Sequence, residues 1–147
     1  MFDTRPLSLA LEALHTNRDR LLTALLKLNA TKVDIDYEGG GDSGDVSGVA
    51  ITPDSLMPQL HSETMGLCRV VRHYEEGDVR HELMDDVAQS LESALKDFTF
   101  SWLEIQHGGW ENNDGARGTV TINVPENRFD LEHESYYTES CHYADSL

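Results

Sequence analysis

Two glycine-rich strings hold the side chains best suited to chemistry. The first, YEGGGDSGDV, carries the carboxylates of Glu38, Asp42 and Asp45 among glycines. Hard cations such as calcium prefer several oxygen ligands of this kind. The spacing lacks the alternating ligands and the terminal bidentate glutamate of an EF-hand loop, however. The string therefore favours a flexible acidic loop over a metal site.

The second string, HGGWENNDGARG, lies between a predicted helix and a predicted hairpin. His107, Glu111 and Asp114 are residue types that act as general acids or bases. A helix end, an aromatic anchor at Trp110 and a tight Asn-Asp-Gly turn explain most of the same residues without any chemistry. We expect the two strings to form one neighbourhood, with Trp110 beside the acidic loop.

A third pattern, HELMD at 81–85, resembles the zinc-protease motif HExxH with aspartate in place of the second histidine. On a helix, His81 and Asp85 would share a face. The match is short and its third ligand is undefined, and acids in the first turn of a helix are favourable in any case. We therefore predict neither a metal site nor a cofactor.

Apolar periodicity predicts two long helices. Over residues 7–28, leucine and alanine recur every three or four positions, which is the spacing of one helix face. Asn29 is suited to the left-handed conformation that ends a helix. A second helix is predicted from Val79 to His107, with Asp78 as its cap and two glycines to stop it.

Strict alternation of apolar and polar residues predicts the strands. The main strands are expected at 31–38, 46–52, 118–124 and 128–137, with a short strand at 68–74. This order predicts a single α+β domain over residues 1–147, in which two helices cover one face of a two-layer, antiparallel sheet of about four strands. The residues expected to be buried under both helices are Val33, Ile35, Tyr37, Val120, Ile122, Val124, Phe129 and Leu131.

The same alternation predicts a ladder of carboxylates on the open face of the sheet. Its six members are Asp34, Asp36, Glu38, Asp130, Glu132 and Glu134. Side chains on one face of a strand are about 6.6–7 Å apart, close to the spacing of phosphates along a nucleic-acid strand. A polar wet face is common in antiparallel sheets, and that plainer interpretation stays open. The absence of Lys or Arg at these positions favours a nucleic-acid mimic.

Composition sets the boundaries for function. The chain has 147 residues, with 27 acidic against 11 basic residues and a net charge of −16. Nucleic-acid binding through a broad basic patch is therefore excluded. There is no run of about 20 apolar residues that would span a membrane, and no secretory signal. We expect a cytoplasmic protein, and the two widely spaced cysteines argue against a zinc ribbon or a disulfide scaffold.

Three strings together, VDIDYEGGGDSG, WLEIQHGGWENNDGARG and LEHESYYTES, carry a resemblance that covers about residues 31–140. They resemble a family of small, acidic, uncharacterised proteins carried by bacterial plasmids and other mobile elements. The resemblance implies no established activity. It implies a setting, in which mobile DNA must escape restriction or CRISPR immunity, or control its transfer.

We therefore predict a non-enzymatic acidic binding protein that occupies the basic groove of a nucleic-acid-handling protein. An inhibitor of a bacterial defence system, such as a CRISPR effector or a restriction enzyme, fits this description. The chain itself is not expected to bind nucleic acid or membrane. The expected partner-binding residues are Asp34, Asp36, Glu38, Asp42, Asp45, Asp130, Glu132, Glu134, Trp110 and Glu111.

Two alternatives remain open at this point. One is a metal-assisted hydrolase that uses Glu38, Asp42 and Asp45 of the first string with His107 and Glu111 of the second. The other is a structural or regulatory partner of another mobile-element protein.

Overall fold

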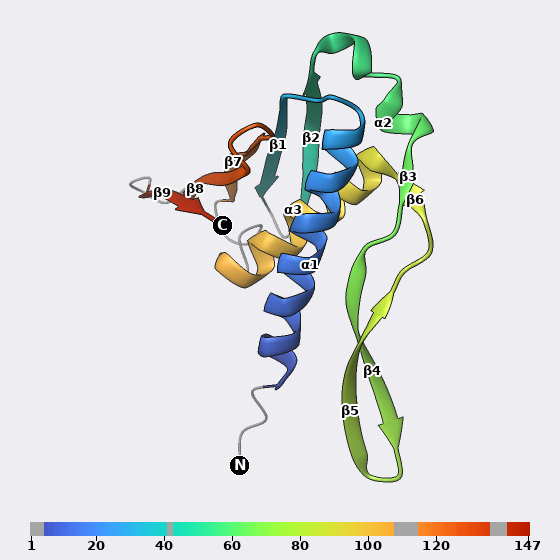
Figure 1. Ribbon diagram of the computed structural model, residues 1–147. Coiled ribbons are helices and arrows are strands. Elements are labelled where there is room, and N and C mark those ends of the chain that lie inside the picture. Colours follow the sequence, from blue (N-terminus) through green and yellow to red (C-terminus); the bar gives the residue numbers. More distant parts are fainter. Residues whose placement is uncertain (1–4, 41–42, 108–114, 136–140) are drawn as a thin grey trace.

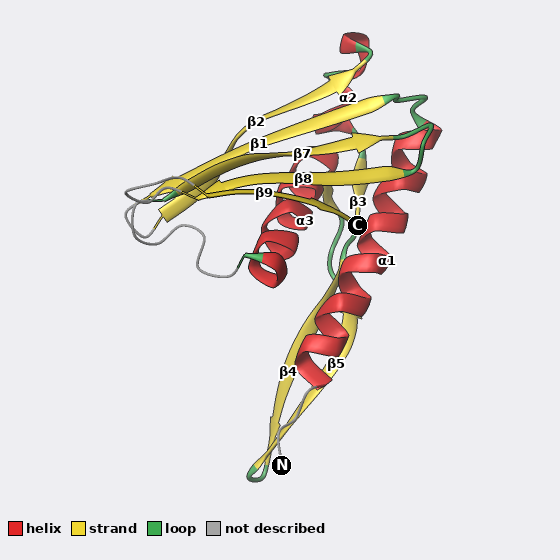
Figure 2. Ribbon diagram, turned by 90° about the vertical axis from the view of Figure 1, so that its left-hand side faces the viewer, coloured by secondary structure: helices red, strands yellow, loops and turns green. Residues whose placement is uncertain are grey.

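A five-stranded antiparallel sheet and two long helices form the body of the molecule, and a slender two-stranded ribbon extends from it (Figures 1 and 2). The computed structural model describes residues 5–40, 43–107, 115–135 and 141–147. The main sheet has the spatial order β2 (Ser43–Thr52), β1 (Lys32–Gly40), β7 (Ala116–Asn123), β8 (Arg128–Ser135) and β9 (Cys141–Ser146).

The remaining elements connect and cover this sheet. The helices are α1 (Arg5–Lys27), the 3-10 turn η1 (Asp54–Leu56), α2 (Gln59–Ser62) and α3 (Leu91–Gln106). Two smaller ribbons pair β3 (Thr64–Met65) with β6 (Gln89–Ser90), and β4 (Cys68–Glu75) with β5 (Asp78–Asp85). Figure 2 shows α1 and α3 on the same side of the main sheet. No described helix is long and apolar enough to cross a membrane.

The first predicted helix and the predicted core are confirmed. In α1, Leu14, Leu21 and Leu25 are buried. Asn29 follows the helix with a positive φ of 61°, which asparagine tolerates better than most residues. All eight residues expected beneath the helices are at most 3% exposed. They pack into one hydrophobic cluster with α3 residues such as Phe98 and Trp102.

The second predicted helix is wrong over its first twelve residues, 79–90. Residues 78–85 form the strand β5, and α3 begins only at Leu91, where Ser90 caps it by accepting a hydrogen bond from the Ser93 N–H at 3.1 Å. The spacing of Val79 and Leu83 fits both a helix face and a strand face. Gly77, with φ 76°, turns the chain back so that β5 pairs with β4, and this pairing decides between the two.

Because HELMD lies on the strand β5 and not on a helix, its resemblance to the zinc-protease motif does not produce a metal site. Residues four apart on an extended strand are about 13 Å from each other, so His81 and Asp85 cannot hold one ion. Asn17 of α1 fastens the base of the ribbon. Its buried side-chain amide donates to the Cys68 carbonyl at 2.8 Å and accepts from the Cys68 N–H at 2.6 Å.

Both ends of the main sheet differ from the prediction. The sheet has a fifth strand, β9, in a stretch where the sequence shows no clean alternation. The predicted acidic loop after β1 is largely a hairpin, because Glu38 pairs with Asp45 and Gly40 with Ser43. Asp42 lies outside the described residues.

Two glycines of the sheet differ in what surrounds them. A Cβ at Gly118 of β7 would collide with the Tyr37 hydroxyl and with the Glu132 carbonyl oxygen. A Cβ at Gly48 of β2 would meet nothing within 4 Å. Tyr37 can therefore lie across β7 only because Gly118 has no side chain.

We predict that Gly118→Ala lowers the free energy of unfolding by about 1–3 kcal/mol, since the overpacked sheet must shift. Gly48→Ala should leave stability unchanged or raise it by about 0.4–1 kcal/mol, because alanine reduces the entropy of the unfolded chain. Denaturant unfolding of both variants tests the pair. Equal stability of the two variants would contradict the packing of Tyr37 over β7.

Candidate binding surface on the sheet

The outer face of the main sheet is the one opposite α1 and α3 (Figure 2). The strand register places many acidic residues on this face. Among the described residues, no helix packs on this face. Three rows cross β1, β7 and β8 in register: Glu38–Arg117–Glu134, Asp36–Thr119–Glu132 and Asp34–Thr121–Asp130. All six predicted ladder residues therefore lie on one face, and Asp45 joins them beside Glu38.

The face is less uniformly acidic than the sequence suggested. The six ladder positions themselves carry no Lys or Arg, but three cations lie beside them and form ion pairs, one within a row and two along a strand. Their shortest N···O distances are 3.5 Å for Lys32–Asp34, 3.6 Å for Arg117–Glu134 and 2.7 Å for Arg128–Asp130. Arg117 comes from β7, one residue before the expected strand 118–124. Lys32 and Arg128 lie within the expected strands, and the alternation that places Asp34 and Asp130 on this face places them there too.

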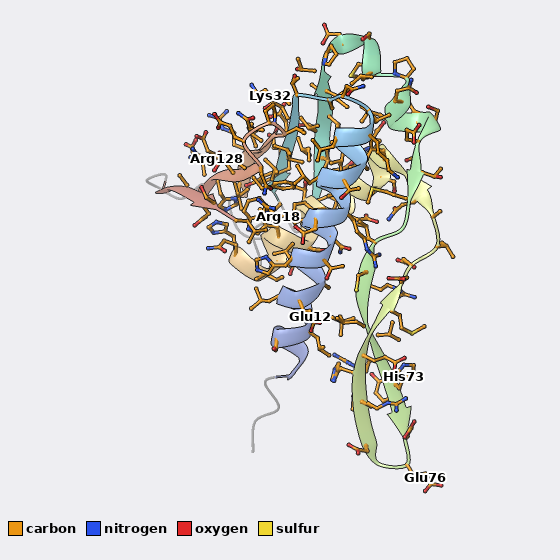
Figure 3. All side chains as sticks on the ribbon, viewed as in Figure 1. Glu12, Arg18, Lys32, His73, Glu76 and Arg128 are labelled. Carbon is orange, nitrogen blue, oxygen red and sulfur yellow. The ribbon has the colours of Figure 1, made fainter. Side chains whose placement is uncertain are left out.

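The cations are distributed unevenly, so the two ends of the face differ in charge. Lys32 and Arg128 occupy the same row, on either side of Asn123, and Figure 3 shows both at one end of the sheet. Seven carboxylates against three cations leave an excess of four negative charges among the described side chains of this face. That excess lies toward the opposite end, around Asp36, Glu38 and Glu132.

Hydroxyl groups hold several of the carboxylates in place. Thr119 donates to Asp36 at 2.6 Å, Thr121 to Asp34 at 3.1 Å, and Ser146 to Asp130 at 2.6 Å. Partial burial alone would raise the pKa of Asp130, but hydrogen bonds from Ser146 and Arg128 outweigh it and lower the pKa overall. The expected full exposure is thus confirmed for Asp36 and Glu132, while Asp34, Asp130 and Glu134 are half-buried.

A hollow of about 440 Å³ marks the acidic end of the face. Its floor includes Gly118, and its side chains are those of Asp36, Glu38, Glu132, Glu134, Arg117, Ser47 and Thr119. Within the described parts of the chain, no cation lies within 4 Å of Asp36, Glu38, Asp45 or Glu132. No set of three or more described His, Cys, Asp or Glu residues is arranged to hold a metal ion.

A separate polar cluster lies on the helix side of the sheet. The Tyr37 hydroxyl and His133 Nδ1 are 2.6 Å apart, and both residues are 1% exposed. The His133 ring stacks on His107 with centroids 4.2 Å apart, and His107 Nε2 lies 3.0 Å from Asp145 Oδ2. Sequence analysis missed this cluster, although His133 shares the inward positions of β8 with apolar residues and therefore needs a buried partner.

Burial governs the titration of this cluster. Burial and, to a smaller extent, the nearby His107 together lower the pKa of His133 to about 4, although Asp145 acts in the opposite direction. Burial, followed by the negative charge of Asp145, raises the pKa of Tyr37 above its ordinary value. His133 is thus neutral at neutral pH.

The three described residues of the hydrolase alternative lie on two sides of the sheet. His107 lies with His133 on the helix side, whereas Glu38 and Asp45 lie on the outer face, so the sheet stands between them. Trp110, Glu111 and Asp42 lie outside the described residues, and so does most of the predicted neighbourhood of the two glycine-rich strings.

We predict that the free energy of unfolding falls as the pH drops from about 6.5 to about 4. The unfolded chain takes up a proton near the ordinary histidine pKa of 6.5, whereas folded His133 stays neutral down to about 4. The loss is on the order of 3 kcal/mol. Carboxylates titrate in part of this window, so the informative quantity is the difference from a variant.

The variant His133→Gln supplies that difference, because glutamine does not titrate and can still accept a hydrogen bond from Tyr37. Denaturant unfolding at pH 4.5 and pH 7 should show a smaller loss for the variant than for the natural chain. An identical loss in both proteins would mean that His133 is not held neutral by its partners, Tyr37, His107 and Asp145.

Comparison with known proteins places the chain in a family. The model of DUF6878, a family of unknown function, matches residues 13–147. No curated protein and no solved structure matches the chain. The match spans nearly all of the chain, from the middle of α1 to the last residue. The protein therefore belongs to the DUF6878 family.

Proposed function

We propose that the protein is a non-enzymatic binding protein whose outer sheet face takes up basic side chains of a partner protein. The observation that carries the proposal is the hollow beside Asp36, Glu38 and Glu132, where carboxylates without a described cation surround a concave space. Arg117 supplies one positive charge against the four carboxylates of the hollow, so a further cationic group would relieve their remaining repulsion.

The chemistry of the hollow favours a protein partner over other cations. Its carboxylates come from β1 and β8 on either side of β7, so they are spread around a space rather than converging on one point. A planar guanidinium can hydrogen-bond several carboxylates at once, which a single small ion at the centre of a wide hollow cannot do. The net charge of −16 also opposes binding of a nucleic-acid backbone.

A nucleic-acid-handling protein is the partner class that we favour within this proposal. Its basic groove is built for negative charges at regular spacing, and carboxylates two residues apart on a strand recur at about 6.6–7 Å. Lys32 and Arg128 interrupt the acidic surface at one end, so the mimicry is confined to the rows around the hollow. Inhibition of a CRISPR effector or a restriction enzyme fits the mobile-element setting that the sequence resemblance implies.

Two variants with equal charge change test the role of the hollow. Asp36→Asn with Glu132→Gln removes two carboxylates at the hollow, and Asp34→Asn with Asp130→Asn removes two that already pair with cations. With octa-arginine as the probe, the first variant should bind about tenfold more weakly than the natural chain, and the second less than about threefold.

Calorimetric titration at low and at high salt provides the measurement, with melting curves to verify folding. Binding by the natural chain should weaken as salt rises, because the contact is between charges. An equal loss of affinity in both variants would mean that binding depends only on the net charge of the protein. Absence of probe binding at low salt would refute the proposed function. Crosslinking in a bacterial host would then identify the partner itself.

A further inference from the structure

Strand β2 forms an open edge of the main sheet. It pairs with β1 on one side only, and Figure 2 shows no described element beyond its other side. An edge strand presents a row of N–H and C=O groups that can pair with another chain.

The register shows which groups point outward from this edge. The Val124 N–H donates to the Thr31 carbonyl, so the odd-numbered residues of β1 pair with β7 and the even-numbered ones with β2. Their partners on β2 are Gly48, Ala50 and Thr52. Val49 and Ile51 therefore direct their N–H and C=O groups to the open edge, where no described residue bonds them.

The part of this edge from Gly48 to Thr52 lacks the features that usually protect an edge strand. It contains no charge and no proline, both of which natural sheets use to prevent unwanted pairing. Asp45 and the bulge that leaves Ser47 without a partner residue on β1 lie before this part of the strand. The ribbon is better protected. Asn17 covers the edge of β4 at Cys68, and β5 carries four charged side chains, those of Asp78, Arg80, Glu82 and Asp85.

The outer face beside the edge carries only small side chains. The residues of β2 next to Asp34 and Asp36 are Ala50 and Gly48. Gly48 has no positive φ, and a Cβ there would meet open space, so neither backbone conformation nor packing requires glycine. Its effect is to clear a path of about 10 Å, two strand spacings, from a strand added beyond β2 to the carboxylates of β1. The long side chains of Arg and Lys can cover most of that distance.

We propose that β2 accepts an extended basic segment of the partner as an additional antiparallel strand. Apolar residues of the segment lie on the helix side, beside Val49 and Ile51, and its Arg or Lys residues lie on the outer face. They reach across Gly48 and Ala50 to Asp36 and the hollow. This proposal rests on the proposed function, because it assumes a basic partner and adds how that partner is held.

Charge favours this occupant over a second copy of the chain. Pairing of two β2 edges would place small neutral residues opposite each other and leave the carboxylates of both hollows without a counter-charge. It would also bring together two chains of net charge −16. A basic strand satisfies the backbone edge and the carboxylates together.

Synthetic peptides test the mode of binding. An eight-residue peptide of alternating Val and Arg should bind about tenfold or more tightly than its isomer with four Val followed by four Arg, since only the first can place all arginines on one face. In an antiparallel pairing, directly opposed residues share a face, so the Val residues of the peptide bond β2. N-methylation of the Val nitrogens should therefore abolish binding, whereas N-methylation of the Arg nitrogens should leave most of it.

Variants of the chain test the cleared path. Gly48→Thr should fold normally, because the new side chain meets open space, and should weaken the alternating peptide about fivefold or more by obstructing its arginines. Ala88→Thr is the control, since it introduces the same residue at an exposed position outside the main sheet. Its affinity for the peptide should be unchanged.

The outcomes separate this inference from the function on which it rests. If the alternating and block peptides bind equally and methylation has no effect, strand addition is wrong while the acidic face remains a binding surface. If neither peptide binds at low salt, the proposed function itself fails. If the chain is a dimer that Val49→Pro converts to a monomer, the edge belongs to a second copy and the inference is overturned.

Discussion

The two-residue period of β1 is the constraint on which the surface of this protein depends. Val33, Ile35 and Tyr37 are at most 1% exposed beneath the helices, and this burial forces Asp34, Asp36 and Glu38 onto the opposite face. A register slip of one residue would bury three carboxylates and expose three core side chains, which no chain of ordinary stability can tolerate. The acidic face is therefore as firmly specified as the core, and its charges cannot withdraw from one another by local rearrangement.

The carboxylates of the outer face are neutralised unevenly, so one end of the face is more negative than the other. Lys32, Arg128 and the hydroxyl of Ser146 compensate the carboxylates at one end of the sheet. At the other end Arg117 is the cation on the central strand, and it stands among Glu38, Asp36, Glu132 and Glu134. Repulsion concentrated at the hollow lowers the stability of the free protein slightly, and the same repulsion becomes a source of affinity when a cation enters.

The sequence revealed elements wherever one periodicity had no competitor. In α1 and in β1 the apolar residues fit a single pattern. The predicted core residues of β1 are all buried, and most of the apolar face of α1 is buried, although Leu11 is exposed. Val79 and Leu83 satisfied two patterns, and only the pairing of β5 with β4 through the turn at Gly77 distinguishes them, which is a non-local fact. The ladder acids were placed on the correct face, but Arg117 lies on a neighbouring strand, and the contact between Tyr37 and His133 joins residues 96 positions apart. Contacts of this kind depend on how the strands are aligned with one another, and a single sequence does not specify that alignment.

The open edge of β2 and the hollow would have to be satisfied by the same partner segment. A sheet edge alone accepts any extended chain, and a carboxylate cluster alone attracts any cation, so neither feature by itself selects a partner. In the proposed binding mode, the distance between the edge and the carboxylates makes the two features selective together. Gly48 and Ala50 set the distance between Val49 at the edge and Asp36 beside the hollow, and only a strand with long basic side chains on one face and apolar ones on the other can satisfy both at once. Discrimination of this kind does not depend on overall charge, because a block of arginines carries the same charge and meets only one of the two requirements.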